Sequence, residues 1–376
     1  MNFTFAEEQE MLKKMARDFL VDKCPKTAVK QMQESEKGYS PELWQEMADL
    51  GWMGLVLPEK YGGTEMSFLD LTVLLEEMGR ACLPGPFIST VVLGALPILE
   101  SGTDEQKQKY LPGISAGKII FTLALSEAGG SYDAASIAVK ATVDKDGYVI
   151  NGAKLFVPDA NIADFMLCVA RTDENAAPEK GLTVFIVDAK SQGISHTVLK
   201  TIAHDKLCEV VFKDVKVSKD NILGKPNQGW EIVQRIMQKA AVAKCAQSLG
   251  GLQQMLDMTV AYAKERVQGK IIGSFQVIQH YCATMATDVD GSRFSTYQAA
   301  WMLSQGLPSV TEVVIAKAFA NEAFGRVSTL AHQIHGAIGC TIDHDLQYYT
   351  RQGAAAALTF GSGDDCREML AQEMGL

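Results

Sequence analysis

Cysteine and histidine are the residue types in this chain that could bind a metal ion or form a disulfide. The chain has eight cysteines, none paired in a CxxC motif: Cys24, Cys82, Cys168, Cys208, Cys245, Cys282, Cys340 and Cys366. Their scatter through apolar segments predicts reduced, mostly buried thiols in a cytoplasmic protein. His332 and His335 are three residues apart, but no cluster of cysteines or carboxylates joins them at ligand spacing. The sequence therefore predicts no metal site.

Helical patterns cover the N-terminal part of the chain. Ser40 followed by Pro41 is a typical helix start, and Thr103 with Gln106 forms a capping box for a short helix. Longer helices are predicted over residues 42–50, 67–80 and 90–100. These signals predict an N-terminal helical domain over residues 1–117.

Near residue 118 the spacing of apolar residues changes from helical to alternating. Strands are predicted over residues 119–125, 136–143, 148–157, 165–171, 182–187, 196–202 and 208–217. Short strands joined by turns with glycine and aspartate predict a middle antiparallel β domain over residues 118–227.

From Trp230 onward the pattern is helical again, with periodic segments over residues 230–265, 275–304, 308–333 and 343–373. These predict a C-terminal four-helix bundle over residues 228–376, and the whole chain is predicted to be α+β. Gly250 and Gly251 either separate helices or let two helices approach closely. Residues 313–316 read Val-Val-Ile-Ala, so this helix is apolar on more than one face. That predicts an oligomer whose interface is built by the C-terminal helices.

The net charge of −10 argues against a nucleic-acid partner or an anionic membrane surface, because both would repel the chain. No apolar run approaches the ~18 residues that a membrane span requires. The N-terminus leads into an acidic helix, which is not the pattern of a signal peptide.

Eight segments, in order along the chain, resemble the acyl-CoA dehydrogenase family over essentially its full length. Each is weak alone, but their order and spacing identify the family. They are PEKYGG at 58–63, LSEAGG at 125–130, NGAKLF at 151–156, VFKDVKV at 211–217, GW at 229–230, ER at 265–266, FQVIQH at 275–280 and QIHGAIG at 333–339. The resemblance implies FAD as cofactor, an acyl-CoA thioester as substrate and an electron-transfer flavoprotein as electron acceptor.

Three further segments, at 83–86, 156–160 and 343–346, resemble the branch of this family that acts on steroid side chains and other bulky or alicyclic acyl-CoAs. Many members of that branch are heterotetramers of two related subunits. The resemblance therefore implies a paralogous partner subunit and a role in lipid or steroid catabolism.

The family reaction removes a proton from the carbon α to a thioester and a hydride from the β carbon. General-base assistance to the first step is worth about 10²–10⁴-fold in rate. Relatives place the catalytic carboxylate at positions that correspond to Phe360 or Ala240. Neither side chain accepts a proton. Asp364 and Asp365 follow Phe360 closely, but they fit a solvated acidic cap on the last helix better than a displaced base.

Other positions correspond to residues that contact FAD in relatives. The resemblance implies cofactor binding by Leu125, Ser126, Phe156, Pro158, Arg266, Phe275, Gln276, Gln333, His335 and Gly336. Pro158 replaces a threonine whose hydroxyl can bond flavin N5, and proline offers neither a hydroxyl nor an N–H. Tyr132 replaces a small residue, so its ring either intrudes on the flavin or packs on the β domain. Glu127 is interpreted as a structural acid.

The C-terminal candidates in relatives reach across a subunit interface to a neighbour's FAD. A guanidinium such as that of Arg266 suits a pyrophosphate because it can bind two oxygens at once. Glycines within 336–339 let the backbone approach a cofactor. The segment after Arg266 is one residue shorter than usual, which could displace the arginine. His335 is either a cofactor contact or a core histidine.

The favoured interpretation is the base-less subunit of a two-gene acyl-CoA dehydrogenase. One alternative is an active homo-oligomer with a non-standard base. Another is a protein that binds a CoA ester and has no redox role.

Overall fold

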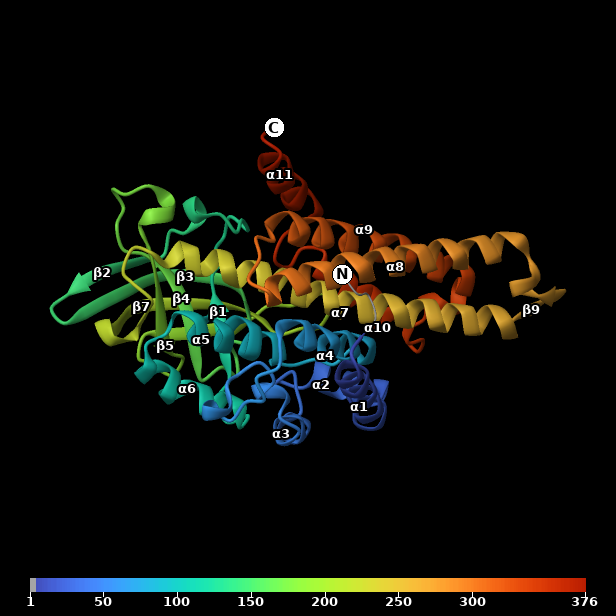
Figure 1. The fold of residues 1–376 in the computed structure, drawn as a ribbon, viewed down its shortest axis with the longest axis horizontal. Coiled ribbons are helices and arrows are strands. Elements are labelled where there is room, and N and C mark those ends of the chain that lie inside the picture. The colour runs from blue at the N-terminus through green and yellow to red at the C-terminus, as the bar shows by residue number, and fades with distance from the viewer. Residues whose placement is uncertain (1–4) are drawn as a thin grey trace. The chain divides into compact units, whose positions relative to one another are not determined.

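The computed structural model describes residues 5–376 and confirms the order of helices, strands and helices (Figure 1). The described chain forms two compact units. A helical unit contains residues 5–31, 67–83 and 241–376, and a sheet unit contains residues 32–66 and 84–240. The domain limits at 117/118 and 227/228 remain predictions from the sequence.

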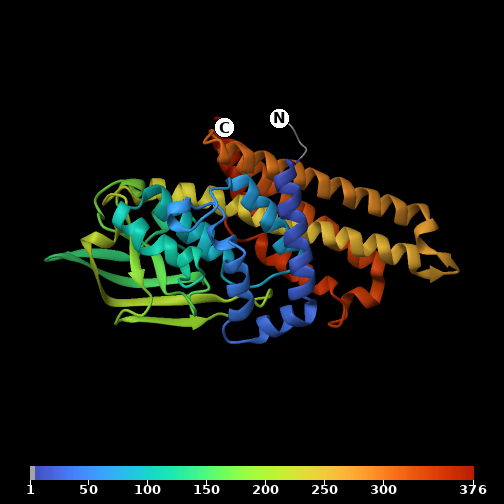
Figure 2. The same ribbon diagram turned by 60° about the horizontal axis from the view of Figure 1, so that its bottom comes forward.

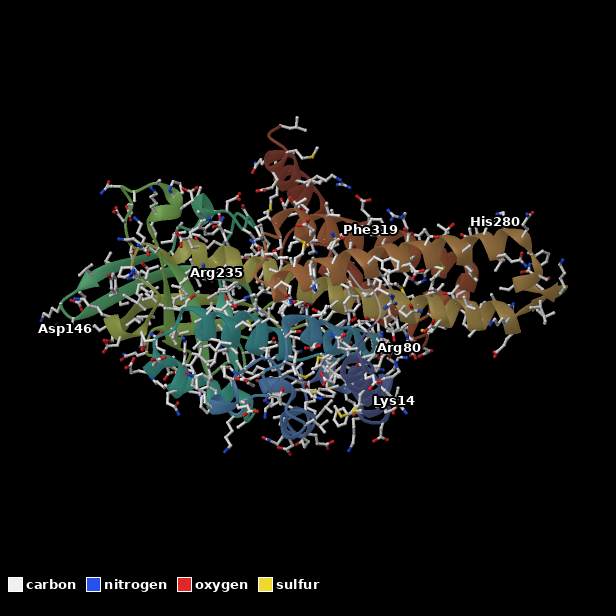
Figure 3. The ribbon with its side chains drawn as sticks, in the orientation of Figure 1. Lys14, Arg80, Asp146, Arg235, His280 and Phe319 are labelled. Atoms are coloured by element: carbon white, nitrogen blue, oxygen red, sulfur yellow. The ribbon has the colours of Figure 1, made fainter. Side chains whose placement is uncertain are left out.

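The helical unit is built mainly from long helices, and Figures 1 and 2 show α8 and α9 running side by side. The ring of Phe319 on α9, labelled in Figure 3, lies so close to α8 that a Cβ on Gly291 would be 2.6 Å from it. The helices of this unit are α1 (Glu7–Lys23), α4 (Phe68–Ala81), α8 (Gln276–Ser304), α9 (Val310–His335), α10 (Leu346–Ala356) and α11 (Gly363–Glu373), with the first part of α2 (Lys26–Glu34) and most of α7 (Gly229–Glu265).

Two glycines let α4 and α7 approach each other at backbone distance. A Cβ on Gly250 would lie 1.8 Å from the carbonyl oxygen of Glu76, and a Cβ on Gly79 would lie 2.0 Å from the carbonyl oxygen of Gln247. Helix α7 continues unbroken through Gly250. Of the two roles predicted for this glycine, close approach is therefore confirmed.

A buried carboxylate joins three helices of the same unit. Glu76 on α4 is 2% exposed and lies 2.7 Å from Arg293 Nη1, 3.2 Å from Lys13 Nζ and 2.5 Å from Tyr297 Oη. Burial acts to raise the pKa of Glu76, but the two cations and the tyrosine hydroxyl outweigh it and hold that pKa below its usual value. The network links α1, α4 and α8.

The sheet unit has an eight-stranded sheet in the order β6-β7-β3-β2-β4-β5-β8, with β1 paired to β4 outside that path. Its apolar core includes Ile150, Phe185 and Phe212. The strands are β1 (Phe121–Ala124), β2 (Lys140–Asp144), β3 (Gly147–Pro158), β4 (Phe165–Arg171), β5 (Leu182–Asp188), β6 (Ile194–Val198), β7 (Leu207–Ser218) and β8 (Ile222–Leu223). The helices of this unit are α3 (Pro41–Asp49), α5 (Leu96–Ser101) and α6 (Asp104–Ser115), with the start of α7.

The prediction of an antiparallel sheet needs one correction. Strand β1 pairs in parallel with β4 along its whole length, and β2 meets β4 in parallel at Lys140 and Arg171. The other pairings of the sheet are antiparallel. A parallel neighbour requires a long connection, which here contains the whole β2–β3 hairpin between β1 and β4.

Local boundaries also differ from the predictions. The helix predicted over 90–100 is a π-helical segment, Ile88–Ala95, followed by α5, and the strand predicted over 136–143 begins only at Lys140. The strand predicted over 196–202 is β6, which ends at Val198. The periodic segment at 343–373 is two helices, so the C-terminal part has five α-helices instead of four. Apolar periodicity continues across 357–362, but the chain turns at Phe360 and Gly361, whose φ angles are +59° and +111°.

The sequence predicted an oligomer interface because residues 313–316 are apolar on more than one face of the helix, and the structure corrects that reason. Val313, Val314 and Ala316 are 3%, 4% and 0% exposed within the single chain, because α9 is surrounded by α8, α10 and α11. Ile315 alone of the four is open, at 42% exposed. The oligomer itself remains a prediction.

The eight cysteines are free thiols, and six of them are buried. This confirms the predicted burial, while Cys282 is half-buried and Cys340 is exposed. No group of metal-binding side chains occurs within residues 5–376, and in that range no helix is long and apolar enough to cross a membrane.

The α4–α7 contact predicts that Gly250→Ala lowers stability by about 1–3 kcal/mol or more, because the added methyl group has no room beside the Glu76 carbonyl. Gly325→Ala on α9 is the matched control, since a Cβ there meets nothing within 4 Å. It should be neutral or raise stability by up to about 1 kcal/mol. Thermal unfolding midpoints at fixed FAD concentration measure both. Equal midpoints for the two variants would contradict the close contact.

Candidate functional site

The structure brings the end of β1 and the last part of β3 together. The backbone N–H of Leu155 donates to the carbonyl oxygen of Ser126 over 2.8 Å, and the Thr122 hydroxyl donates to the carbonyl oxygen of Pro158 over 2.5 Å. Four predicted cofactor contacts, Leu125, Ser126, Phe156 and Pro158, therefore belong to one local arrangement in the sheet unit.

A bulge in β3 turns Phe156 outward. The register with β7 shifts between Lys154 and Val157, and Phe156 has a φ of +56°, which is uncommon for a residue with a side chain. Its ring is 50% exposed, whereas Val157 beside it is 1% exposed. The bulge thus presents a flat apolar surface at the edge of the strand.

The buried side chain of Lys154 on β3 holds the loop that follows β1, at residues 125–127, in place. Its side chain is fully buried, and Nζ lies 2.9 Å from the carbonyl oxygen of Leu125 and 2.7 Å from Glu127 Oε1. Glu127 also accepts hydrogen bonds from the backbone N–H groups of Ala138 and Val139, at 2.9 and 3.1 Å. Burial lowers the pKa of Lys154, and the Glu127 carboxylate offsets part of that shift. Glu127 is therefore a structural acid, as predicted.

These residues fit a flavin in all respects but one, which is a hydrogen-bond donor for flavin N5. Ser126 is 8% exposed, and its hydroxyl has no hydrogen-bond partner in the described part of the chain, so it is available to a ligand. Gly129 and Gly130 leave open space where a Cβ would stand. Pro158 provides no donor for flavin N5, and Tyr132 is half-buried. The residues present could hold FAD, with Ser126 and the Phe156 surface as contacts.

The second group of candidates lies in the helical unit. Arg266 follows α7 and is exposed, and its guanidinium has no ion-pair partner within residues 5–376. The shortened segment forms a tight hairpin of β9 (Val267–Gln268) and β10 (Lys270–Ile271) around Gly269, whose φ is +72°. Ile272 N–H donates to the Arg266 carbonyl oxygen over 2.9 Å, which closes the hairpin. Phe275 and Gln276 then begin α8 and are exposed.

The end of α9 meets the end of α7. The His335 ring stacks on Tyr262, four residues before Arg266, with centroids 4.5 Å apart. His335 is 4% exposed, and its Nδ1 lies 2.9 Å from the Ala331 carbonyl oxygen, so its environment is that of a core histidine. Gln333 is exposed. Gly336 has φ +63° and ψ −144°, a conformation that essentially only glycine adopts. Of the three candidates at the end of α9, Gln333 and Gly336 are thus exposed and His335 is buried.

Neither expected base position can take part in proton transfer. Ala240 is 0% exposed on α7, and Phe360 is half-buried in the turn before α11. Asp365 accepts hydrogen bonds from the N–H and hydroxyl of Ser362, at 2.8 and 2.7 Å, as the capping box of α11. The side chain of Asp364 is 97% exposed and pairs with Arg367. Their role as an acidic helix cap is confirmed.

Sequence reasoning assigned no role to Lys154 or Thr122. A signal for Lys154 was present in the alternation of β3, because it falls four residues after the buried Ile150 and so on the same face of the strand. A lysine on an inward face requires a buried acceptor, and that requirement points to Glu127 or a carbonyl oxygen. Thr122 gave no signal, since its partner is a backbone carbonyl.

Three domain families match the chain. They are "Acyl-CoA dehydrogenase, N-terminal domain" over residues 6–118, "Acyl-CoA dehydrogenase, middle domain" over residues 122–215, and "Acyl-CoA dehydrogenase, C-terminal domain" over residues 227–375. Together they cover most of the sequence, in the order of the fold.

Individual proteins are similar over comparable lengths. The chain is 31% identical to the probable acyl-CoA dehydrogenase YngJ of Bacillus subtilis, covering 100% of both chains. It is 32% identical to the caffeyl-CoA reductase-Etf complex subunit CarC of Acetobacterium woodii, covering 89% of both. The structure of butyryl-CoA dehydrogenase from Megasphaera elsdenii superimposes with a TM-score of 0.93 at 29% identity over 100% of both chains. The Tcur3481–Tcur3483 steroid ACAD superimposes with a TM-score of 0.88 at 30% identity over 98% of both.

We predict that Lys154→Met destabilises the protein by about 3–5 kcal/mol, because it leaves the Glu127 carboxylate buried without its cation. The loop at 125–127 should loosen, and FAD retention should fall with it. The double variant Lys154→Met/Glu127→Gln should be less destabilised, since no buried charge is left unpaired. Unfolding midpoints and bound FAD per chain are measured. A single variant as stable as the native protein would contradict the role of the pair.

Arg266→Ala is expected to weaken FAD binding in the assembled protein about ten- to a hundredfold, the value of one charge-assisted hydrogen bond to phosphate. Lys14→Ala removes an exposed cation of α1 (Figure 3) and should leave FAD binding unchanged. Flavin content after dilution and gel filtration is compared. Equal retention in both variants would show that the hairpin holds Arg266 away from the cofactor.

Proposed function

The chain belongs to the acyl-CoA dehydrogenase family, and from this premise we propose that it is the base-less subunit of a heteromeric enzyme. Family members are FAD-dependent oxidoreductases that act on CH–CH bonds of acyl-CoA thioesters, and this chain is an enzyme of that class. The proposal concerns its place in the assembly, which is to complete a flavin site whose proton-transfer step depends on a carboxylate of the partner.

The observation that carries the proposal is the loss of a proton acceptor at Ala240 and at Phe360 together. Each nearby acid already has a structural role, because Asp365 caps α11 and Asp364 pairs with Arg367 in solvent. Glu127 is held by Lys154 and two backbone N–H groups. Abstraction of an α proton needs a base within hydrogen-bond reach. The absence of a base at both positions therefore supports a carboxylate supplied by a partner subunit.

The parts that would bind FAD are retained. When bound, FAD supplies the acceptor for the hydride from the β carbon. Ser126 offers a hydroxyl that has no hydrogen-bond partner within residues 5–376, and the outward Phe156 ring offers a flat apolar contact. Arg266 offers an exposed guanidinium for a neighbouring pyrophosphate. A chain that keeps cofactor contacts while losing both base positions fits a supporting subunit better than an independent catalyst.

The proposed partner is a paralogue that has the missing carboxylate, in a tetramer. The likeness to the Tcur3481–Tcur3483 steroid ACAD, which is named for two components, supports this arrangement and a bulky acyl-CoA such as a steroid side-chain thioester. An electron-transfer flavoprotein is the proposed electron acceptor, and the likeness to a subunit of an Etf complex supports it. The free thiols fit a cytoplasmic location.

The isolated chain, supplied with FAD, is expected not to desaturate acyl-CoA substrates at a useful rate. Loss of general-base assistance alone costs about 10²–10⁴-fold, and the absent N5 contact at Pro158 adds to that. Flavin bleaching is followed with steroid, alicyclic and straight-chain acyl-CoAs, for the chain alone and after co-expression with a paralogue that has the carboxylate. Bleaching should appear only in the second preparation.

Rapid bleaching by the chain alone, abolished when one Asp or Glu is replaced, would overturn the proposal in favour of an active homo-oligomer. A co-expressed preparation without bound flavin would favour a CoA-ester-binding protein. Asp365→Asn serves as the control, because Asp365 is a helix cap and its replacement should not change the bleaching rate in either preparation.

A further inference from the structure

Two buried hydroxyls hold the end of β3 in the sheet unit. The Thr122 hydroxyl on β1 donates to the carbonyl oxygen of Pro158 over 2.5 Å. The Ser89 hydroxyl donates to Asp159 Oδ2, also over 2.5 Å, a length typical of a hydrogen bond to a carboxylate. Ser89 and Thr122 are 2% and 0% exposed, so water competes little with either donor. Because Ser89 engages its carboxylate, Asp159 is a structural acid, as Glu127 is.

A third hydroxyl links the segment of Ser89 to strand β1. Ser89 belongs to the π-helical segment Ile88–Ala95, and the next residue, Thr90, contacts the backbone of Phe121 on β1. Thr90 Oγ1 lies 3.3 Å from the Phe121 nitrogen and 3.4 Å from the Phe121 carbonyl oxygen. A Cβ on Gly94 would lie 2.3 Å from Phe121 Cβ, so the π-helical segment rests directly on the strand. The π-helical segment, β1 and the end of β3 thus form a closed set of contacts.

The end of β3 has a backbone that requires such support. Phe156 and Asp159 have φ angles of +56° and +54°, which residues with a side chain seldom adopt. Such a conformation persists only where the surrounding structure holds it, and it occurs often at binding sites. The N–H of Asp159 donates to the Lys206 carbonyl oxygen over 2.7 Å, which holds the backbone. The contact with Ser89 holds the side chain, and a substitution can remove it without altering the backbone bond.

The segment held in this way is part of the candidate flavin site. Phe156 and Pro158 are predicted cofactor contacts, and Leu155 beside them donates its N–H to the carbonyl oxygen of Ser126, which is another. Pro158 has neither a hydroxyl nor an N–H, so it contacts a flavin through its shape alone. A contact of that kind requires its atoms to be held within about 0.5 Å of the productive position. The contacts that fix the segment therefore matter to the cofactor.

We propose that Ser89 is a positioning residue of the flavin site, which acts through Asp159 to place Phe156 and Pro158 against the cofactor. The Ser89 hydroxyl fixes the Asp159 carboxylate, the carboxylate helps to fix the left-handed backbone of its own residue, and that backbone carries Pro158. The inference rests on the flavin site of the proposed function. It does not depend on the missing base or on a partner subunit.

The test uses the full-length protein as purified with its flavin, and it follows the release of FAD after dilution. Ser89→Ala should release FAD at least about fivefold faster than the native protein, because a hydrogen bond to a carboxylate is worth about tenfold or more and part of that effect reaches the segment. The absorption band and the fluorescence of the FAD that stays bound should shift as well, since the flavin then meets a displaced surface.

Two variants of Asp159 test the same contact from its other side. Asp159→Asn keeps an acceptor oxygen for the Ser89 hydroxyl and tolerates a positive φ, so it should lose FAD much more slowly than Asp159→Ala. Asp159→Ala removes the acceptor and should behave like Ser89→Ala. The double variant Ser89→Ala/Asp159→Ala should release FAD no faster than the more severe single variant, because both substitutions remove one and the same bond.

Thr183→Val separates positioning from a general loss of stability. Thr183 on β5 is 0% exposed, and its hydroxyl accepts a hydrogen bond from the Asn227 N–H over 2.9 Å, so this variant also loses a buried hydroxyl of the sheet unit. Its unfolding midpoint should fall as that of Ser89→Ala does, while its FAD release and flavin spectrum stay native.

Native FAD release and a native spectrum in Ser89→Ala would overturn the inference, as would equal changes in Thr183→Val. If Ser89→Ala does not fold, equal FAD release from Asp159→Asn and Asp159→Ala overturns it instead. These outcomes leave the proposed heteromer untouched, because no acyl-CoA is used. A native protein that holds no flavin would overturn both the inference and the flavin site on which it rests.

Discussion

The buried contact between Lys154 and Glu127 is the interaction on which the candidate flavin site depends. A fully buried ammonium costs several kcal/mol unless it is paired and hydrogen-bonded, and this one has a carboxylate and a carbonyl oxygen as partners. Those partners lie in the loop after β1, so satisfying the lysine places that loop against β3. Ser126 and the bulge at Phe156 become neighbours for this reason.

Other carboxylates of the chain also have structural partners. Glu76 joins α1, α4 and α8 through two cations and a tyrosine, and Asp365 holds the start of α11. Glu127, Asp364 and Asp365 are thus already bound to protein partners. A carboxylate that serves as a general base must instead be open to the substrate, and the acids described at these sites do not meet that requirement. This distribution of charge is what makes a partner subunit the favoured source of the base.

Helix termini bring the remaining groups together. The end of α7 meets the end of α9 where Tyr262 stacks on His335, and the hairpin after Arg266 and the start of α8 follow α7 directly along the chain. Beyond that contact the chain turns at Gly336, which has a conformation that side chains oppose, and reaches Cys340 beside His332. The glycine predicted to contact a cofactor therefore lies in a short turn next to His332, which a hydrogen bond to Thr350 links to α10.

The sequence by itself determined the order of elements, the limits of most helices and strands, and the identity of the positions that lost a base. Those features are local, because periodicity, caps and side-chain type do not depend on distant contacts. Ser362 with Asp365 and Thr103 with Gln106 were readable as caps for that reason. Tertiary structure alone decided the parallel pairing of β1 with β4, the burial of residues 313, 314 and 316, the break at Phe360 and the partner of Lys154. Each of these depends on residues far apart in sequence, whose packing and hydrogen bonds override local preference once the chain has folded.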